Sequence, residues 1–170
     1  RVLDLCAAPG GKSTQIAGIL KGEGILVCNE IHPQRAKILS ENIERMGVSN
    51  ACVTNESPER LSGFFPEYFD KILTDAPCSG EGMFRKNEEA GREWSPENVK
   101  MCAERQDRIL DEAAKMLRPA GTLVYSTCTF AEEEDEGSVM RFLARHPEFS
   151  LEETKRFWPH KVKGEGHFAA

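Results

Sequence analysis

The chain has 170 residues, and its 39% hydrophobic and 29% charged content is ordinary for a globular domain with one buried core. The formal net charge of −6 has the wrong sign for a protein that holds nucleic acid by charge alone. No apolar run approaches the roughly 18 residues of a membrane span, and no segment has the pattern of a signal peptide. We therefore expect a cytoplasmic protein with no membrane partner.

Apolar runs alternate with segments of helical period along almost the whole chain. Strands are expected at 2–6, 24–29, 50–54, 69–75 and 121–126. Helices are expected at Lys12–Leu20, Pro33–Met46 and about Pro96–Leu117. Such alternation favours right-handed βαβ units, which build a parallel α/β sheet with helices on both faces.

One segment departs from this alternation. From Ser79 to Trp94 the chain carries three glycines and little periodicity, and it contains the cluster Met83-Phe84-Arg85-Lys86. Loops of this length without regular structure are usually functional or mobile. Because this loop directly follows Cys78, we expect it to contact the substrate.

The six cysteines stand more than twenty residues apart along the chain. Zinc sites and redox motifs need closer pairs, so we expect neither a metal ion nor a disulfide framework. We interpret four of them as small buried apolar residues: Cys6, Cys28, Cys52 and Cys102.

A glycine-containing turn follows the first strand and opens the first helix, the usual place for a nucleotide-bearing ligand. It reads Cys6-Ala7-Ala8-Pro9-Gly10-Gly11-Lys12, which has neither the P-loop spacing nor G-x-G-x-x-G. Glu30 ends the second strand, where a carboxylate can accept hydrogen bonds from both ribose hydroxyls. A ribose carboxylate without a pyrophosphate site favours S-adenosyl-L-methionine. The alternative is a plain tight turn and a solvated Glu30.

Two further cysteines follow expected strands. Cys78 lies in Asp75-Ala76-Pro77-Cys78-Ser79-Gly80, and Cys128 lies in Tyr125-Ser126-Thr127-Cys128-Thr129-Phe130. In a doubly wound sheet the fourth and fifth strands are neighbours, so both thiols should meet beside the ligand loop. A thiolate that adds to carbon 6 of cytosine makes carbon 5 nucleophilic enough to accept a methyl group, and a second polar group assists the later elimination. These residues do not tell which thiol attacks.

Three stretches resemble the signature motifs of the NOL/NOP/Sun RNA 5-methylcytosine methyltransferases: residues 6–12, residues 75–80 and Ser126-Thr127-Cys128-Thr129. Residues 80–86, Trp94-Ser95-Pro96, Trp158-Pro159-His160-Lys161 and 164–168 are most similar to the ribosomal small-subunit methyltransferase F branch. The resemblance covers essentially the whole chain. It implies a Rossmann-like class I methyltransferase with a mostly parallel seven-stranded sheet.

The resemblance also implies roles for single residues. Cys128 would be the nucleophile, Cys78 would assist product release, and Asp75 would lie between the cofactor and the target base. Residues 6–12 and Glu30 would bind S-adenosyl-L-methionine. Family members often have Asp near the adenine after the third strand; here Asn55 has the better adenine-reading chemistry, whereas Ser57 matches by spacing.

A second departure is Asp135, where the family usually has Asn. It lies in the acidic run 132–136, which we interpret as structural because acids favourably meet the dipole at a helix start.

The substrate implied by the resemblance is RNA, most specifically small-subunit ribosomal RNA. Both chain ends are strand-like, so we expect residues 1–170 to be a monomeric catalytic core excised from a longer protein, whose flanking parts supply RNA grip. The competing hypothesis is a non-catalytic RNA-binding or ribosome-assembly module that retains the fold, which the acidic charge would suit. A methyltransferase for protein or small molecules is a third option, but such enzymes rarely need this thiol chemistry.

Overall fold

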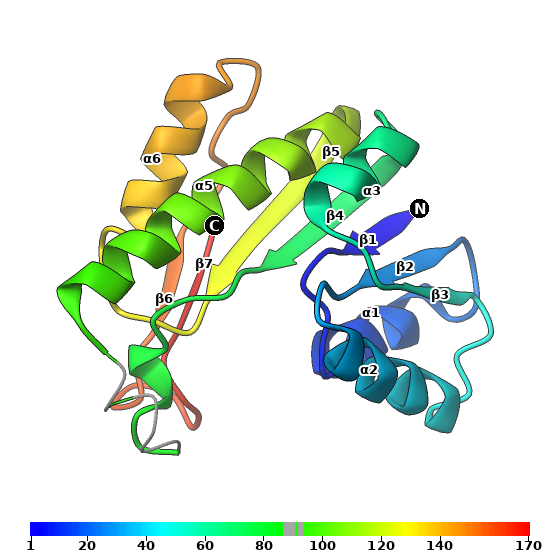
Figure 1. The fold of residues 1–170 in the computed structure, drawn as a ribbon, viewed down its shortest axis with the longest axis horizontal. Coiled ribbons are helices and arrows are strands. Elements are labelled where there is room, and N and C mark those ends of the chain that lie inside the picture. The colour runs from blue at the N-terminus through cyan, green and yellow to red at the C-terminus, as the bar shows by residue number, and fades with distance from the viewer. Residues whose placement is uncertain (87–90, 92–93) are drawn as a thin grey trace. The chain divides into compact units, whose positions relative to one another are not determined.

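The computed structural model describes residues 1–86, 91 and 94–170 (Figure 1). The strands in this part of the chain are β1 Val2–Asp4, β2 Leu26–Asn29, β3 Ala51–Thr54, β4 Phe69–Asp75, β5 Leu117–Thr127, β6 Lys155–Phe157 and β7 His167–Ala169. The helices are α1 Gly11–Leu20, α2 Pro33–Arg45, α3 Pro58–Phe64, the 3₁₀ turn η1 Glu81–Met83, α5 Pro96–Met116 and α6 Glu136–Arg145.

The strands form a seven-stranded sheet in the order β3-β2-β1-β4-β5-β7-β6. The pairs β1–β2, β1–β4 and β2–β3 are parallel, whereas β7 is antiparallel to both β5 and β6. This order confirms the predicted α/β sheet, in which the fourth strand lies between the first and the fifth.

The chain divides into two compact units. The first comprises Arg1–Asp75 with Glu112–Val124, and the second comprises Ala76–Asp111 with Tyr125–Ala170. Strand β5 therefore begins in the first unit and ends in the second.

In the first unit, α1 and α2 pack on one face of the parallel strands. Ala17 of α1 and Leu39 and Ile43 of α2 share a core cluster with Leu26 and Cys28 of β2. All four residues of β2 are buried, as is typical of a strand covered on both faces. Helix α3 lies on the other side of these strands (Figure 1).

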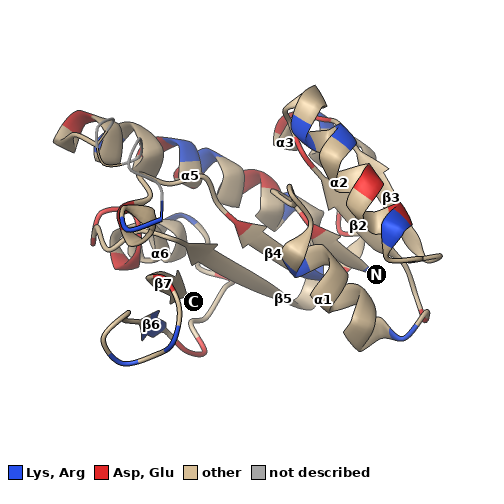
Figure 2. Ribbon diagram, turned by 90° about the horizontal axis from the view of Figure 1, so that it is seen from below, with Lys and Arg blue, Asp and Glu red and all other residues tan. Residues whose placement is uncertain are grey.

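In the second unit, the end of β5 pairs with β7. Ser126 lies opposite Ala169 and Thr127 lies opposite Phe168, which is wholly buried. Charges of both signs are spread along α5 (Figure 2), and two of its acidic residues, Asp107 and Asp111, pair with arginines of α6. No helix in the described ranges is both long and apolar enough to cross a membrane.

Observed and predicted elements differ mainly at short segments. Helices α1, α2 and α5 confirm the predictions within one residue at each end, and the strand-like C-terminal residues form β7. Strand β5 was predicted too short: it begins at Leu117 and includes Pro119. The fixed φ of proline is compatible with extended backbone, so Pro119 ends the helical pattern without ending the strand.

Candidate active site

Side chains of α2 hold the loop of residues 6–10, which follows β1. Arg35 donates to the Ala8 carbonyl at 2.9 Å, and Asn42 donates to the Pro9 carbonyl at 2.8 Å. These two carbonyls belong to no helix or strand, so side chains of α2 supply their hydrogen-bond donors. The loop is thus fixed by its neighbouring helix rather than by its own sequence.

The two glycines at the end of this loop have different roles. Gly10 takes φ +111°, in the left-handed region, and a Cβ there would lie 3.1 Å from Cδ1 of Leu39. Gly11 begins α1, and nothing lies within 4 Å of where its Cβ would be. The first amides of α1 have no helical acceptor, so a polar ligand can approach them closely.

A buried carboxyl group supports the start of α1. Asp4 is wholly buried and accepts a hydrogen bond from Ser13 Oγ at 2.6 Å. Burial above all raises the pKa of Asp4 to about 6. Burial also raises the pKa of the neighbouring Cys6 thiol, so Cys6 is a structural rather than a reactive cysteine. Sequence reasoning missed Asp4 and Ser13, although an acid inside an apolar strand was a signal.

Glu30 is buried at the end of β2 and is not the solvated strand end that was the alternative. Its Oε1 accepts the His32 amide at 2.9 Å, and its Oε2 lies 3.4 Å from the Arg35 guanidinium. A carboxylate has about four acceptor positions, so Glu30 retains capacity for ribose hydroxyls.

Asn55, not Ser57, bonds to the Glu30 backbone. Its Nδ2 donates to the carbonyls of Glu30 at 2.6 Å and Ile31 at 3.0 Å. These bonds use both amide hydrogens, so Asn55 Oδ1 is the atom that can accept a hydrogen from an adenine amino group. Ser57 caps α3 by accepting the Arg60 amide at 3.3 Å.

Lys12 and Asp75 form an ion pair. The Lys12 ammonium lies 2.7 Å from Asp75 Oδ2, and both side chains are about one third exposed. The pair joins the first turn of α1 to the end of β4. Lys12, one of the residues expected to bind the cofactor, thus has a carboxylate as its partner.

The two cysteines fifty residues apart in the sequence meet in the second unit. Cys78 Sγ and Cys128 Sγ are 3.2 Å apart, and the Cys128 amide donates to Cys78 Sγ at 3.3 Å. The thiol contact and burial raise the pKa of Cys78 far above its ordinary value. The two sulfurs are close enough to pass a proton from one to the other, and their contact does not tell which of them attacks.

Hydrogen bonds on both sides of the thiols fix this meeting. The residue after each cysteine carries a hydroxyl, and the hydroxyls of Ser79 and Thr129 are 2.9 Å apart and buried. The Gly82 amide donates to the Cys128 carbonyl at 2.9 Å. These bonds tie the loop that follows β4 to the loop that follows β5.

The four remaining cysteines are not all buried. Cys28 and Cys102 are buried and Cys6 is partly buried, but Cys52 is exposed. Our interpretation of Cys52 as a buried apolar residue was wrong because β3 lies at the edge of the sheet. In the segment predicted to be irregular, residues 81–83 form η1, while 87–90 and 92–93 lie outside the described residues.

Asp135 is wholly buried where α6 begins. It accepts a hydrogen bond from Thr127 at 2.5 Å and lies 3.1 Å from the Arg156 guanidinium, which also pairs with Glu136. Burial outweighs these contacts and raises the pKa of Asp135 to about 7. Of the acidic run, only Glu136 stands in the first turn of α6, where the helix dipole favours an acid. Glu134 and Asp135 are buried, whereas Glu132 and Glu133 are exposed.

We expect Asp135→Asn to remove a pH dependence of stability. The raised pKa means that the folded state keeps a proton that the unfolded state loses near pH 4, so the contribution of Asp135 falls as the pH rises from 4 to 7. Between pH 5 and 8 the free energy of unfolding of the parent should drop by about 2 kcal/mol relative to the variant. Urea titrations of both proteins at these pH values measure it, and a constant difference would contradict the prediction.

The structure groups the predicted site residues within the two units. Residues 6–12, Glu30, Asn55 and Asp75 belong to the first unit, and Cys78 and Cys128 belong to the second. The meeting of the two thiols is confirmed by their contact. Their meeting with the ligand loop stays a prediction. Among the residues described, no group of three His, Cys, Asp or Glu side chains could hold a metal ion.

Comparisons with known proteins place the chain in a family. Residues 1–170 match the family described as 16S rRNA methyltransferase RsmB/F. Ribosomal RNA small subunit methyltransferase F of Vibrio vulnificus is 50% identical over 135 residues, which are 79% of this chain and 29% of that protein. The protein of the same name from Escherichia coli is 45% identical over 148 residues, 87% of this chain and 31% of that protein. The chain thus spans about three tenths of the length of these relatives.

Solved structures agree in fold. NSun6 from Pyrococcus horikoshii, in a crystal structure with SFG, superposes with a TM-score of 0.88 at 33% identity, over 99% of this chain and 46% of that chain. The resemblance inferred from the glycine and cysteine motifs is confirmed over the full 170 residues. The chain belongs to the 16S rRNA methyltransferase RsmB/F family.

Proposed function

We propose that this chain transfers a methyl group from S-adenosyl-L-methionine to carbon 5 of cytosine in small-subunit ribosomal RNA. The observation that carries the proposal is the contact of Cys78 and Cys128 at 3.2 Å in a member of this family. Carbon 5 of cytosine needs a thiol that adds to carbon 6 and a second group that helps the thiol leave. Two adjoining thiols meet both needs.

The residues of the first unit fit S-adenosyl-L-methionine, which supplies the methyl group as a sulfonium. Glu30 would accept the ribose hydroxyls, and Asn55 Oδ1 would accept the adenine amino group. The glycine turn at residues 10–11 leaves room beside the first amides of α1 for the methionine carboxylate. The absence of a pyrophosphate motif agrees with this ligand.

Cys128 would supply the electrons for the transfer. Its thiol loses a proton, and the thiolate forms a bond to carbon 6, which makes carbon 5 an enamine carbon able to attack the sulfonium methyl. The proton on carbon 5 then leaves, the carbon–sulfur bond breaks, and the Cys128 thiolate is released. The ring recovers its double bond, and the protons lost by the Cys128 thiol and by carbon 5 pass to solvent. Once the Cys128 thiolate has taken a proton from Cys78 and Cys78 has regained one from solvent, the enzyme is back in its starting state.

Cys78 and Asp75 would assist this cycle. Cys78 touches the departing sulfur of Cys128, and its raised pKa keeps it protonated, so it can give a proton to the thiolate that leaves. The Asp75 carboxylate, bonded to Lys12, would accept a hydrogen bond from the cytosine amino group and stabilise charge that develops on the base.

The remaining proposals concern the whole protein. The matched relatives are about three times longer than this chain, which supports a catalytic core flanked by RNA-binding parts. Their names specify small-subunit ribosomal RNA, which supports RNA as the partner and a cytoplasmic place of action. A monomer without a metal ion stays our prediction.

The full-length protein, labelled S-adenosyl-L-methionine and small-subunit RNA test the proposal. We expect label on carbon 5 of cytosines, with large-subunit RNA as the matched control. Label on another base or atom would contradict it. Calorimetry with S-adenosyl-L-methionine tests the alternative of a non-catalytic module, because a well-folded protein that does not bind it would favour that alternative.

We expect Cys78→Ala to accumulate a covalent protein–RNA adduct. Attack by Cys128 does not need the Cys78 side chain, but release of the Cys128 sulfur does, so the adduct should persist and turnover should fall at least about a hundredfold. Denaturing gels with labelled RNA measure the adduct.

Cys52→Ala is the control for that experiment, because Cys52 is exposed and belongs to the first unit. It should turn over normally and show no more adduct than the parent. If the adduct appears instead in Cys128→Ala, the two cysteines have the opposite roles.

A further inference from the structure

Two polar side chains with no role in the reaction above are wholly buried beside the Cys78 loop. They are Gln106, on α5, and Glu134, just before α6. A buried carboxylate is costly unless it is well bonded. Burial raises the pKa of Glu134, and no basic side chain of the described residues lies within 4 Å of it. Packing alone would be served as well by an apolar residue.

Both side chains bond the backbone on either side of Cys78. Glu134 accepts the Ser79 amide, at 3.0 Å on Oε2 and 3.3 Å on Oε1. Gln106 Nε2 donates to the Pro77 carbonyl at 3.1 Å. The residue before Cys78 and the residue after it are therefore each held by a buried side chain.

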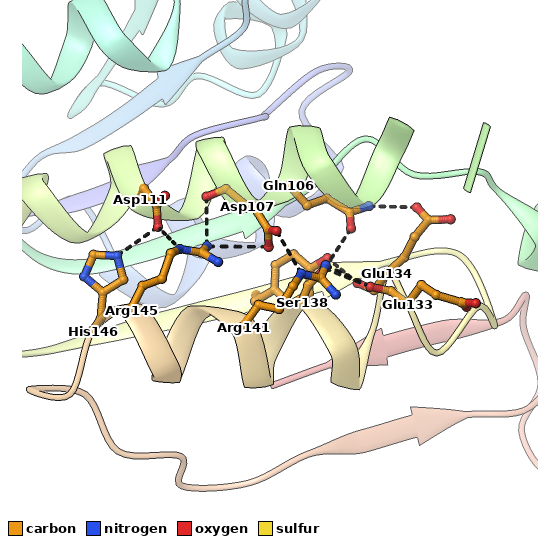
Figure 3. Close-up of polar contacts among 10 residues, drawn as sticks. Gln106, Asp107, Asp111, Glu133, Glu134, Ser138, Arg141, Arg145 and His146 are labelled. Atoms are coloured by element: carbon orange, nitrogen blue, oxygen red, sulfur yellow. Dashed lines mark hydrogen bonds and ion pairs between the residues drawn. The ribbon is translucent and has the colours of Figure 1, made fainter. Parts of the chain in front are cut away.

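Glu134 and Gln106 also fix each other. Gln106 Nε2 donates to Glu134 Oε2 at 2.8 Å, as Figure 3 shows. The other end of the amide, Gln106 Oε1, accepts a hydrogen bond from Ser138 at 3.1 Å. This bond sets the orientation of the amide, so that its nitrogen faces both Glu134 and Pro77. No atom of the Gln106 side chain amide can turn without losing a buried bond.

Helices α5 and α6 do not need this pair to stay together. Farther along the same two helices, Arg141 bonds to Asp107 at 2.8 Å and Arg145 bonds to Asp111 at 3.0 Å (Figure 3). The side chains of both ion pairs are partly exposed to solvent. The Gln106–Glu134 pair differs from them because, besides the bond of Gln106 to Ser138, both of its side chains also bond to the Cys78 loop.

We propose that Glu134 and Gln106 are positioning residues that hold Cys78 against Cys128 for release of the product. The inference rests on the proposed function of Cys78. Fixing both flanking peptides fixes the direction of the Cys78 Cα–Cβ bond, and with it the 3.2 Å contact between the sulfurs. A shift of about 1 Å in such a contact can slow a step a hundredfold.

Full-length Glu134→Gln tests the proposal. Glutamine has the same length, but if its oxygen takes the place of Oε2, which accepts from both Gln106 and Ser79, its nitrogen takes the place of Oε1 and faces the Ser79 amide, donor against donor. We expect the adduct to form within about twofold of the parent rate in a single turnover and to resolve at least about tenfold more slowly. Glu134→Asp, which keeps the carboxylate, should recover part of the release rate. Glu133→Gln is the matched control, since Glu133 is exposed and should behave as the parent.

A merely structural role would have another signature. Adduct formation and release would then slow together, in proportion to the lost folded protein, and that result would overturn the proposal. Gln106→Met provides a second variant if Glu134→Gln does not fold, because it keeps the size of the side chain and loses the bonds to Pro77 and Glu134. It should show the same separation of formation from release.

Cys78→Ala, measured in parallel, separates this proposal from the proposed function. If Cys78→Ala accumulates no adduct, the role assigned to Cys78 is wrong. If Cys78→Ala accumulates adduct and the Glu134 and Gln106 variants resolve theirs at the parent rate, the role of Cys78 stands and the positioning role is wrong.

Discussion

The full-length protein with Cys128→Ala is expected to lose methyl transfer by roughly three orders of magnitude or more. Without the Cys128 sulfur no bond forms to carbon 6, and carbon 5 of cytosine stays too weak a nucleophile to attack a sulfonium methyl. The rate of label transfer from S-adenosyl-L-methionine to cytosine measures the loss. No protein–RNA adduct should appear on denaturing gels.

Cys128→Ser separates lost chemistry from lost packing. Serine is close to cysteine in size, but its hydroxyl is a far weaker nucleophile at neutral pH, so this variant should be as inactive as Cys128→Ala. Both should bind S-adenosyl-L-methionine with the affinity of the parent, because the proposed ligand residues lie in the first unit. Full methyl transfer by either variant would remove Cys128 from its assigned role.

Gly82→Ala is expected to cost stability and activity together. A Cβ at Gly82 would lie 2.6 Å from the Gly166 carbonyl oxygen and 2.8 Å from the Cys128 carbonyl oxygen. Both obstacles are backbone atoms, which cannot turn aside as a side chain can, so the loop after β5 must move. We expect the free energy of unfolding to fall by about 2 to 3 kcal/mol, as for an overpacked core. Urea titration measures it.

Gly164→Ala is the matched control. Gly164 lies in the β6–β7 connection, as Gly166 does, but nothing is within 4 Å of its Cβ position. Its stability should stay within about 0.5 kcal/mol of the parent. If Gly82→Ala unfolds at the same urea concentration as Gly164→Ala, the close approach at Gly82 does not constrain the Cys128 loop.

The larger elements of this fold could be predicted from the sequence because their patterns are long or continuous. Helix α5 spans 21 residues and its apolar stripe recurs over several turns, whereas β2 begins with the apolar run Leu26-Val27-Cys28 that is typical of a buried parallel strand. Strand β6, with the three residues Lys155–Phe157, has no period to detect, and it exists because β7 pairs with it. Helix α3 was missed although Ser57-Pro58 is a good helix start.

The sequence could predict those site residues whose positions follow from the ends of strands. Cys78 and Cys128 follow neighbouring strands, so their meeting could be expected, but only family resemblance assigns the attacking role to Cys128. Glu134 was not predictable as a distinct residue. In the sequence it cannot be told from Glu132 and Glu133, and its burial depends on partners such as Gln106, 28 positions away. Tertiary contacts, not local pattern, separate one acid in that run from the next.

Strand β5 belongs to both compact units, and this has a consequence for how the chain folds while it is being synthesised. Neither compact unit is a continuous stretch: the first takes residues 1–75 and 112–124, and the second takes 76–111 and 125–170. A nascent chain therefore completes neither unit when its first half has left the ribosome, since the first must wait for residue 124. Domains often fold one after another as they emerge. Here the first unit is completed only after residues 76–111 of the second have been translated, so the first unit cannot finish folding before part of the second has emerged.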